Sequence, residues 1–154
     1  MKLSTKGRYG TRALLDVAIH QGDSPVQLKD IAERQQISLS YLEHLIAPLV
    51  AAGIIKSSRG ARGGVSLGKS PEDISLIDVV LALEGSVAPV ECVDDPAKCP
   101  RADSCVTRDL WIETKKAMES VLESTTLADL VRRQRDKNGS VKIDKNADGS
   151  GFCI

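Results

Sequence analysis

The 154-residue sequence lacks any apolar run near the ~18 residues that a membrane-spanning helix needs, and its opening MKLSTKGRYG lacks an apolar signal region. We therefore expect a cytoplasmic protein with no membrane partner. Histidine is also scarce, because His20 and His44 are the only two in the chain. Both are distant in sequence from a cluster of cysteines after residue 90, which disfavours a catalytic cysteine–histidine pair. We expect neither an enzyme nor a small-molecule substrate.

The sequence has no excess of charge of either sign, since 21 Lys and Arg residues balance 21 Asp and Glu residues. Taken alone, neutrality argues against a nucleic-acid partner. The charges are, however, unevenly distributed: residues 1–70 contain ten basic and five acidic residues, and residues 71–154 contain eleven and sixteen. A basic half on a neutral chain is typical of a protein with one phosphate-binding face. A chance separation of solvated charges stays open as the alternative until the basic residues are placed on a motif.

Three segments in the first third of the chain have the apolar spacing of helices, at residues 9–21, 27–35 and about 39–52. The last two are separated by a break at residues 36–37, and either Ser38 or Ser40 can cap the third helix. Ser40 and Glu43 also have the spacing of a capping box. Pro48 removes a helical N–H inside the third segment, and we expect a kink there and not two separate helices. A short helix, a tight turn and a second helix form the helix-turn-helix pattern, although other small helical bundles share it.

A predicted β-hairpin follows the third helix directly. Residues 54–57 and 65–67 have the composition of strands, and the glycine-rich segment RGARGG at 59–64 is typical of the turn between them. A hairpin in this position is the wing of a winged helix-turn-helix domain. Glycine permits positive φ angles and a close backbone approach, and Arg59 and Arg62 supply positive charge for phosphate. An ordinary surface turn is the alternative, which two arginines among three glycines disfavour.

The second half of the chain is predicted to be helical on both sides of a cysteine-rich loop. Residues 75–83 have helical spacing, a longer amphipathic stretch runs from about 102 to 124, and a short helix covers 127–135. A long amphipathic helix that leaves a DNA-binding domain commonly forms a dimer interface, although it can instead fold back onto its own domain. The tail from Lys137 onward is polar and glycine-rich, and we expect it to be disordered.

The fold class that follows is mainly α with a small β-hairpin. The predicted order is a winged helix-turn-helix DNA-binding domain, a cysteine-rich cluster-binding loop, a dimerisation helix with a C-terminal helix, and a disordered tail. These parts cover residues 1–84, 85–105, 102–135 and 136–154.

Cysteine is rare outside one short segment. Cys92, Cys99 and Cys105 have the spacing C-x6-C-x5-C in a proline-containing loop, and Cys153 stands alone in the tail. Thiolates are the ligands that soft metals and iron–sulfur clusters select, and three ligands leave one coordination position open. The pattern therefore favours a sensor over a purely structural site. We expect Cys153 to be a free thiol with no cluster role.

Three other uses of these cysteines are weaker. Structural zinc usually needs four ligands with C-x2-4-C pairs, and neither spacing here fits. A catalytic thiol lacks a histidine nearby in the sequence. A disulfide framework is the poorest interpretation for a cytoplasmic chain that can build its core without crosslinks. A zinc-stabilised interaction module or a thiol-redox module stays the alternative from a different functional class.

These features together resemble one known family, the IscR-type winged-helix regulators, which also include NsrR, RirA and CymR. The resemblance covers about residues 1–132 and is closest to the IscR branch. It is carried by LSTKGRYGTRALLDVA at 3–18, ISLSYLEHLI at 37–46, RGARGG at 59–64, the three clustered cysteines, and VTRDLW at 106–111. The resemblance implies a transcription regulator that binds double-stranded operator DNA as a homodimer, with each long helix packed on its partner.

The resemblance also implies which residues bind each ligand. An iron–sulfur cluster, 2Fe–2S by overall likeness with 4Fe–4S as the alternative, would be held by Cys92, Cys99 and Cys105. The positions that contact DNA would be Ser38, Ser40, Tyr41 and His44 in the third helix and Arg59 and Gly60 in the wing. Glu43 matches a position that influences operator choice, because a carboxylate can accept from cytosine but repels phosphate. We also expect Arg62 to contact DNA, because its positive charge lies in the turn of the predicted wing.

Three positions depart from the family pattern. Arg108 stands where IscR-type proteins have a histidine ligand, and Arg8 stands where NsrR recruits an acidic ligand from the partner. Guanidinium has no lone pair, so the fourth ligand would come from Asp103, Asp109, Glu91, a backbone group, an exogenous thiol or water. Gln36 replaces a frequent turn glycine and requires a strained or rearranged backbone. The implied function is a regulator that senses iron–sulfur cluster status and controls iron–sulfur cluster biogenesis genes, with a nitric-oxide or redox-sensing repressor of the same family as the alternative.

Overall fold

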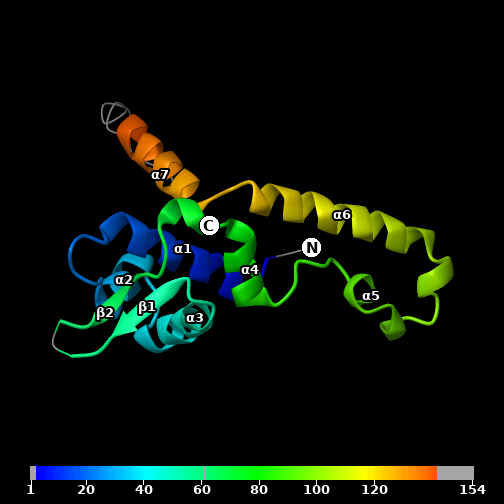
Figure 1. Cartoon of the computed structure of the whole chain (residues 1–154), viewed down its shortest axis with the longest axis horizontal. Coiled ribbons are helices and arrows are strands. Elements are labelled where there is room, and N and C mark those ends of the chain that lie inside the picture. Colours follow the sequence, from blue (N-terminus) through cyan, green and yellow to red (C-terminus); the bar gives the residue numbers. More distant parts are fainter. Residues whose placement is uncertain (1–2, 61, 142–154) are drawn as a thin grey trace.

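A computed structural model describes residues 3–60 and 62–141 of the chain. Its helices are α1 (Thr5–His20), α2 (Leu28–Gln35), α3 (Leu39–Ala51), α4 (Leu76–Glu84), α5 (Glu91–Asp94), α6 (Val106–Glu123) and α7 (Leu127–Val141), with short 3-10 turns at Pro71–Asp73, Pro96–Lys98 and Ala102–Ser104. Strands β1 (Ile55–Ser58) and β2 (Gly64–Leu67) pair antiparallel, with Ile55 opposite Leu67. A mostly helical chain with one two-stranded hairpin confirms the predicted fold class (Figure 1).

One hydrophobic core joins the helix-turn-helix segments, the hairpin, α4 and the start of α7. Leu14 of α1, Ile31 of α2 and Leu42 of α3 are fully buried in it, as are Val79 of α4 and Leu127 of α7. Full burial of such side chains contributes roughly 1.5–3 kcal/mol each. Because the apolar side of α3 is held in this core, its polar side is turned outward.

The N-terminus of α3 is capped by Ser38, whose hydroxyl accepts a hydrogen bond from the backbone N–H of Tyr41 at 3.2 Å. Ser40 lies inside the helix, so the predicted capping box between Ser40 and Glu43 does not form. The helix continues through Pro48 without division into two, as predicted. The first turn of α3 is therefore fixed by a local cap, independently of the proline near its other end.

The turn between α2 and α3 has a strained backbone at Gln36, one of the two alternatives predicted for this residue. This residue has φ 55° and ψ 45°, the left-handed conformation, and its N–H donates to the carbonyl of Glu33 at 3.1 Å. The next N–H, that of Ile37, donates to the carbonyl of Ala32 at 3.0 Å. A left-handed non-glycine residue costs roughly 1–2 kcal/mol, which the surrounding packing must offset. The result is a sharp change of direction between the two helices.

Two helices are longer than predicted. The helix α1 begins at Thr5 and not at residue 9, because the hydroxyl of Ser4 caps it by accepting from the N–H of Gly7 at 3.1 Å. The helix α7 runs to Val141 and not to residue 135, so the predicted disorder is wrong for residues 137–141. Its start is anchored in the core by the fully buried Leu127, and the helix continues from there. The rest of the predicted tail, with Cys153, lies outside the described residues.

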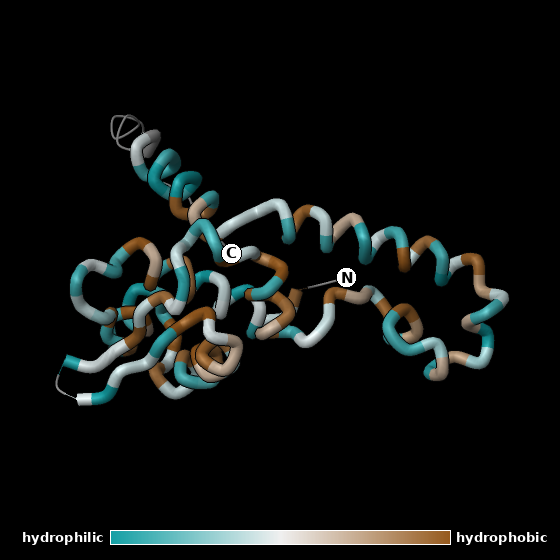
Figure 2. The backbone as a smooth tube through the Cα atoms, in the orientation of Figure 1, coloured by the Kyte–Doolittle hydropathy of each residue, from teal (hydrophilic) through white to brown (hydrophobic). Residues whose placement is uncertain are grey.

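The long helix α6 extends away from the winged domain and carries the cysteine-rich loop with α5 at its far end (Figure 1). It begins at Val106 because the residues from Ala102 to Ser104 form a separate 3-10 turn. None of its 18 residues, all of them described, is fully buried. Apolar residues nevertheless recur along it (Figure 2). In the described part of the chain, no helix combines the length and apolarity needed to cross a membrane.

Candidate DNA-binding face and cysteine loop

The polar side of α3 displays the residues that the sequence predicts for DNA contact. Ser38, Ser40, Glu43 and His44 are exposed near the start of the helix, and Tyr41 is half-buried among them. The opposite side of α3 carries the fully or nearly fully buried Leu42, Leu45, Ile46 and Leu49. The structure therefore brings all five predicted residues of this helix to its N-terminal half, outside the core.

The wing presents Arg59, Gly60 and Arg62 at its exposed tip. Gly60 has φ 106°, a conformation that side chains rarely adopt. At the start of β2, next to this turn, a methyl group on Gly64 would lie 2.4 Å from the carbonyl oxygen of Val26, so only glycine fits there. Val26 and Val65 exchange two backbone hydrogen bonds of 2.8 Å. The wing is thus fastened to the segment that leads into α2.

A groove of about 280 Å³ lies between the wing and the helix-turn-helix. It is lined by Gln27, Leu28, Lys29, Leu39, Glu43, Ser57, Ser58, Gly60, Gly63 and Gly64. Two predicted residues, Glu43 and Gly60, therefore face the same space from α3 and from the wing. The exposed Lys29 of α2 adds a positive charge there that sequence reasoning missed. The sequence feature that could have indicated Lys29 is its position on the polar side of the predicted helix at residues 27–35.

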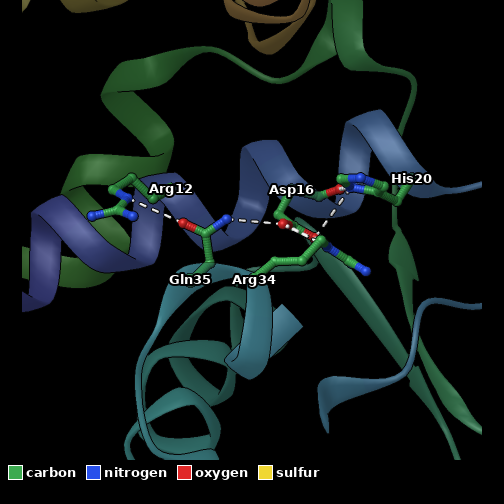
Figure 3. A network of polar contacts seen from close by, with 5 residues as sticks. All are labelled: Arg12, Asp16, His20, Arg34 and Gln35. Carbon is green, nitrogen blue, oxygen red and sulfur yellow. Dashed lines mark hydrogen bonds and ion pairs between the residues drawn. The ribbon is translucent and has the colours of Figure 1, made fainter. Parts of the chain in front are cut away.

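A buried carboxylate holds α2 against α1 (Figure 3). Asp16 is 4% exposed, and Arg34 donates to both of its oxygens, at 2.6, 3.0 and 3.1 Å. Gln35 donates to the same carboxylate at 2.8 Å, and His20 Nδ1 lies 3.3 Å from it. Burial by itself raises the pKa of Asp16, but the hydrogen bonds from Arg34 and Gln35 outweigh it and lower that pKa. Asp16 lies between apolar positions of α1, and this placement is the sequence feature that could have indicated a buried, paired carboxylate.

An aromatic pair joins the start of α1 to α3. The ring of Tyr9 lies 6.2 Å from that of Tyr41 at an interplanar angle of 79°, an edge-to-face arrangement. The guanidinium of Arg12 lies 5.1 Å from the centre of the Tyr9 ring. Sequence reasoning did not place Tyr9 or Arg12 near α3, because no local pattern links the two helices.

The three clustered cysteines lie in one loop, but the structure does not gather them into a ligand set. Cys92 is in α5, Cys99 follows a 3-10 turn, and Cys105 precedes α6; all three are half-buried free thiols. Within residues 3–60 and 62–141, no three His, Cys, Asp or Glu side chains are placed to hold a metal ion. Thiolates suit an iron–sulfur cluster chemically, but the loop would have to rearrange to bind one.

The cysteine loop is attached to α6 by two basic side chains. Arg108 Nε donates to the backbone carbonyl of Cys92 at 2.8 Å, and Lys115 Nζ lies 2.7 Å from the carboxylate of Asp94. Arg108, which departs from the histidine ligand of the IscR-type pattern, therefore holds the loop through this hydrogen bond. Cys105 lies at the N-terminus of α6, and its sulfur is 3.1 Å from the hydroxyl oxygen of Thr107. The hydrogen bond with this hydroxyl lowers the pKa of the Cys105 thiol most, and a hydrogen bond from the backbone N–H of Arg108 lowers it further.

Comparison with known proteins assigns the family. The Rrf2 family, described as "Iron-dependent Transcriptional regulator", matches residues 3–133. The chain belongs to the Rrf2 family. It is 54% identical over 132 residues to Protein rrf2 of Nitratidesulfovibrio vulgaris, covering 86% of this chain and 88% of that protein. It is therefore a transcription regulator and not an enzyme, as predicted.

Two solved structures of Rrf2-family regulators share this fold. CymR, "the Global Cysteine Regulator of B. subtilis", has a TM-score of 0.71 and 44% identity, with 86% of this chain and 98% of that chain covered. IscR of T. potens has a TM-score of 0.70 and 42% identity, with 97% of this chain and 94% of that chain covered. The resemblance to this family is confirmed, and the two identities are too similar to separate its CymR and IscR branches.

Proposed function

We propose that this Rrf2-family regulator binds double-stranded operator DNA through the start of α3 and the tip of the wing, and acts in the cytoplasm. The base-reading positions are Ser38, Ser40, Tyr41, Glu43 and His44, and the wing positions are Arg59, Gly60 and Arg62. The observation that carries this proposal is that Glu43 of α3 and Gly60 of the wing line one groove from two sides, and that the other positions, apart from the half-buried Tyr41, are exposed on the same two elements. A helix presented by its N-terminal turns enters a major groove, and arginines on a wing neutralise phosphate.

The proposed regulator is a homodimer whose interface includes α6. Val106, Leu110 and Val121 on this helix are 79%, 52% and 64% exposed, an unusual state for large apolar side chains on one element. An apolar groove of about 620 Å³ runs between α4, the segment after it and α6, lined in part by Val80, Val87, Met118 and Leu122. A second copy of the chain, bringing its own α6, is the occupant whose chemistry matches both surfaces.

The cysteine loop is the proposed sensor. Cys92, Cys99 and Cys105 would supply thiolates to an iron–sulfur cluster, 2Fe–2S in preference to 4Fe–4S, after the loop rearranges. The family description as iron-dependent and the three thiols in one loop support this role. Such a rearrangement would disturb the contacts of Arg108 and Lys115 with the loop. Because these two side chains belong to α6, a rearrangement of the loop would change contacts of the helix that forms the proposed dimer interface.

The proposed signal is iron–sulfur cluster status, and the proposed targets are iron–sulfur cluster biogenesis genes. Nitric oxide or a redox signal is the alternative, since a thiolate of lowered pKa at the start of α6 suits oxidation chemistry equally well. Anaerobic titration of the DNA-binding affinity with each agent separates the two. An iron chelator should change the affinity under the first proposal, whereas only nitric oxide or peroxide should change it under the second.

The test of the cluster is the visible spectrum of anaerobically purified protein. Iron–thiolate charge transfer colours a cluster, whereas zinc is d10 and colourless. We expect colour in the parent, no colour when an alanine replaces Cys92, Cys99 or Cys105, and unchanged colour in Cys153→Ala. A colourless parent that carries stoichiometric zinc would overturn the cluster and leave the DNA-binding proposal intact.

A further inference from the structure

The half-buried Tyr41 differs from its exposed neighbours on α3 by having a specific partner on another helix. Its ring meets that of Tyr9 edge to face, at 6.2 Å and 79°. Ser40, Glu43 and His44 are exposed on the same part of α3. An edge-to-face pair restricts the directions that both rings can take. The direction of the Tyr41 side chain is therefore set by α1 as well as by α3.

The ring of Tyr9 is held in turn by Arg12. The guanidinium carbon lies 5.1 Å from the ring centre, and Arg12 Nε donates to the side-chain oxygen of Gln35 at 3.1 Å. Figure 3 shows Arg12 reaching across to Gln35, with Gln35 between it and Asp16. A guanidinium has several donors in a fixed plane, so one hydrogen bond and one ring contact define its place.

The orientation of Gln35 follows from the buried carboxylate. Asp16 can only accept hydrogen bonds when ionised, so the amide nitrogen of Gln35 must face it, and does so at 2.8 Å. The amide oxygen is then left to accept from Arg12. Asp16 itself is anchored by Arg34 and is 4% exposed. An ordered series of contacts therefore runs from a buried anchor through Gln35, Arg12 and Tyr9 to Tyr41.

We infer that Tyr9 and Arg12 are positioning residues that set the base preference of Tyr41. The inference rests on the proposed function, because it assumes that Tyr41 reads base edges. It deepens that proposal by assigning part of operator specificity to α1, which lies outside the helix-turn-helix. Loss of either residue would release the Tyr41 side chain without moving the α3 backbone, whose cap at Ser38 is local.

The experiment compares binding of the full-length protein to a duplex that it selects from a randomised pool and to single-base-pair variants of that duplex. The measured quantity is the ratio of the two dissociation constants by fluorescence anisotropy at several salt concentrations. We expect Tyr9→Leu and Arg12→Gln to reduce this ratio about five- to tenfold at the base pairs that Tyr41→Ala affects, within the usual range for one base contact. In the Tyr41→Ala background, the same changes should have almost no further effect, because the residue that they position is absent.

Two control variants distinguish positioning from folding and from charge. Tyr9→Phe keeps the ring and should retain the parental ratio, and Arg135→Gln removes an exposed positive charge from α7 without touching α3. Circular dichroism at the assay temperature confirms that each variant is folded. If Arg12→Gln instead weakened all duplexes equally and flattened the salt dependence, Arg12 would be a phosphate contact and the inference would be wrong.

Different results would overturn the base-reading role of Tyr41 and the positioning role of Tyr9 and Arg12. If Tyr41→Ala left the base preference unchanged, Tyr41 would not read bases, and the inference would fall with that part of the proposed function. If Tyr41→Ala changed the preference while Tyr9→Leu did not, only the positioning role would be overturned. A full additional effect of Tyr9→Leu in the Tyr41→Ala background would also overturn it.

Discussion

Replacing Arg34 with methionine removes the charged contact that holds α2 on α1. Arg34 donates three hydrogen bonds to Asp16, and the carboxylate is almost completely buried. Methionine keeps the apolar stem but leaves Asp16 with the hydrogen bond from Gln35 and the nearby His20. Breaking a fully buried pair costs about 3–5 kcal/mol. Because the Arg34 side chain is 35% exposed, we expect a smaller loss of unfolding free energy, about 2 kcal/mol.

The pH dependence of this loss identifies its cause. The folded-state pKa of Asp16 is lowered, so its ionised form contributes stability above the unfolded-state value of about 3.9. That contribution disappears as pH falls through the folded-state pKa. Without Arg34 the folded-state pKa of Asp16 rises, so the difference in stability between parent and Arg34→Met should be constant near neutral pH and shrink as acid protonates this carboxylate.

The assay is urea unfolding followed by circular dichroism at one fixed protein concentration, because the proposed dimerisation would make apparent stability depend on concentration. A matched control is Arg133→Met, which changes an exposed arginine on α7. A loss below about 0.5 kcal/mol, the usual range for surface substitutions, would refute the reasoning. A difference that persisted unchanged at acid pH would show that Arg34 stabilises the helix pair by something other than the Asp16 carboxylate.

Three further predictions concern the wing, the dimer and the loop. Arg59→Ala and Arg62→Ala should weaken binding to every DNA sequence and reduce the salt slope by about 0.9 per lost phosphate contact; an unchanged slope in salt titrations would exclude the wing as a phosphate clamp. Val121→Glu should shift the dimer to monomer in analytical ultracentrifugation, since a charge would be buried in the apolar interface, and a dimer of parental stability would place the interface elsewhere. Arg108→His should slow the loss of visible colour in air if imidazole takes the open ligand position, whereas Arg108→Gln, which keeps a donor for the carbonyl of Cys92, should not. Equal decay rates in parent and Arg108→His would mean that a strong fourth ligand is already present.

The helix-turn-helix and the wing could be predicted because their signals are local. The apolar spacing around Leu42 and Leu49 marks one side of a helix over a few turns. The glycines near Arg59 mark a turn within six residues. Both patterns depend on neighbours that are close in sequence, so the positions of the exposed residues on α3 and in the wing follow from them. The boundaries were less accurate, because caps such as Ser4 act through single hydrogen bonds.

The cysteine loop illustrates the opposite case. The spacing of Cys92, Cys99 and Cys105 shows that one loop carries three thiols, but their placement depends on how that loop packs on α6. The structure shows that Arg108 contacts the Cys92 carbonyl across 16 residues of sequence. The sequence suggested a missing ligand at this position, and only the tertiary contact shows that the same side chain holds the loop.

The sequence by itself determined the order of the longer helices, the break near Gln36 and the wing, because periodicity and turn chemistry act between residues a few positions apart. It also indicated the family, through motifs that resemble those of known regulators. The tertiary structure alone decided that Arg34 reaches Asp16 across 18 residues and that Tyr9 meets Tyr41. Such contacts depend on the angles at which packed helices cross, and these angles are set jointly by many core side chains. No short segment contains that information, so the residues that position Tyr41 became visible only in the folded chain.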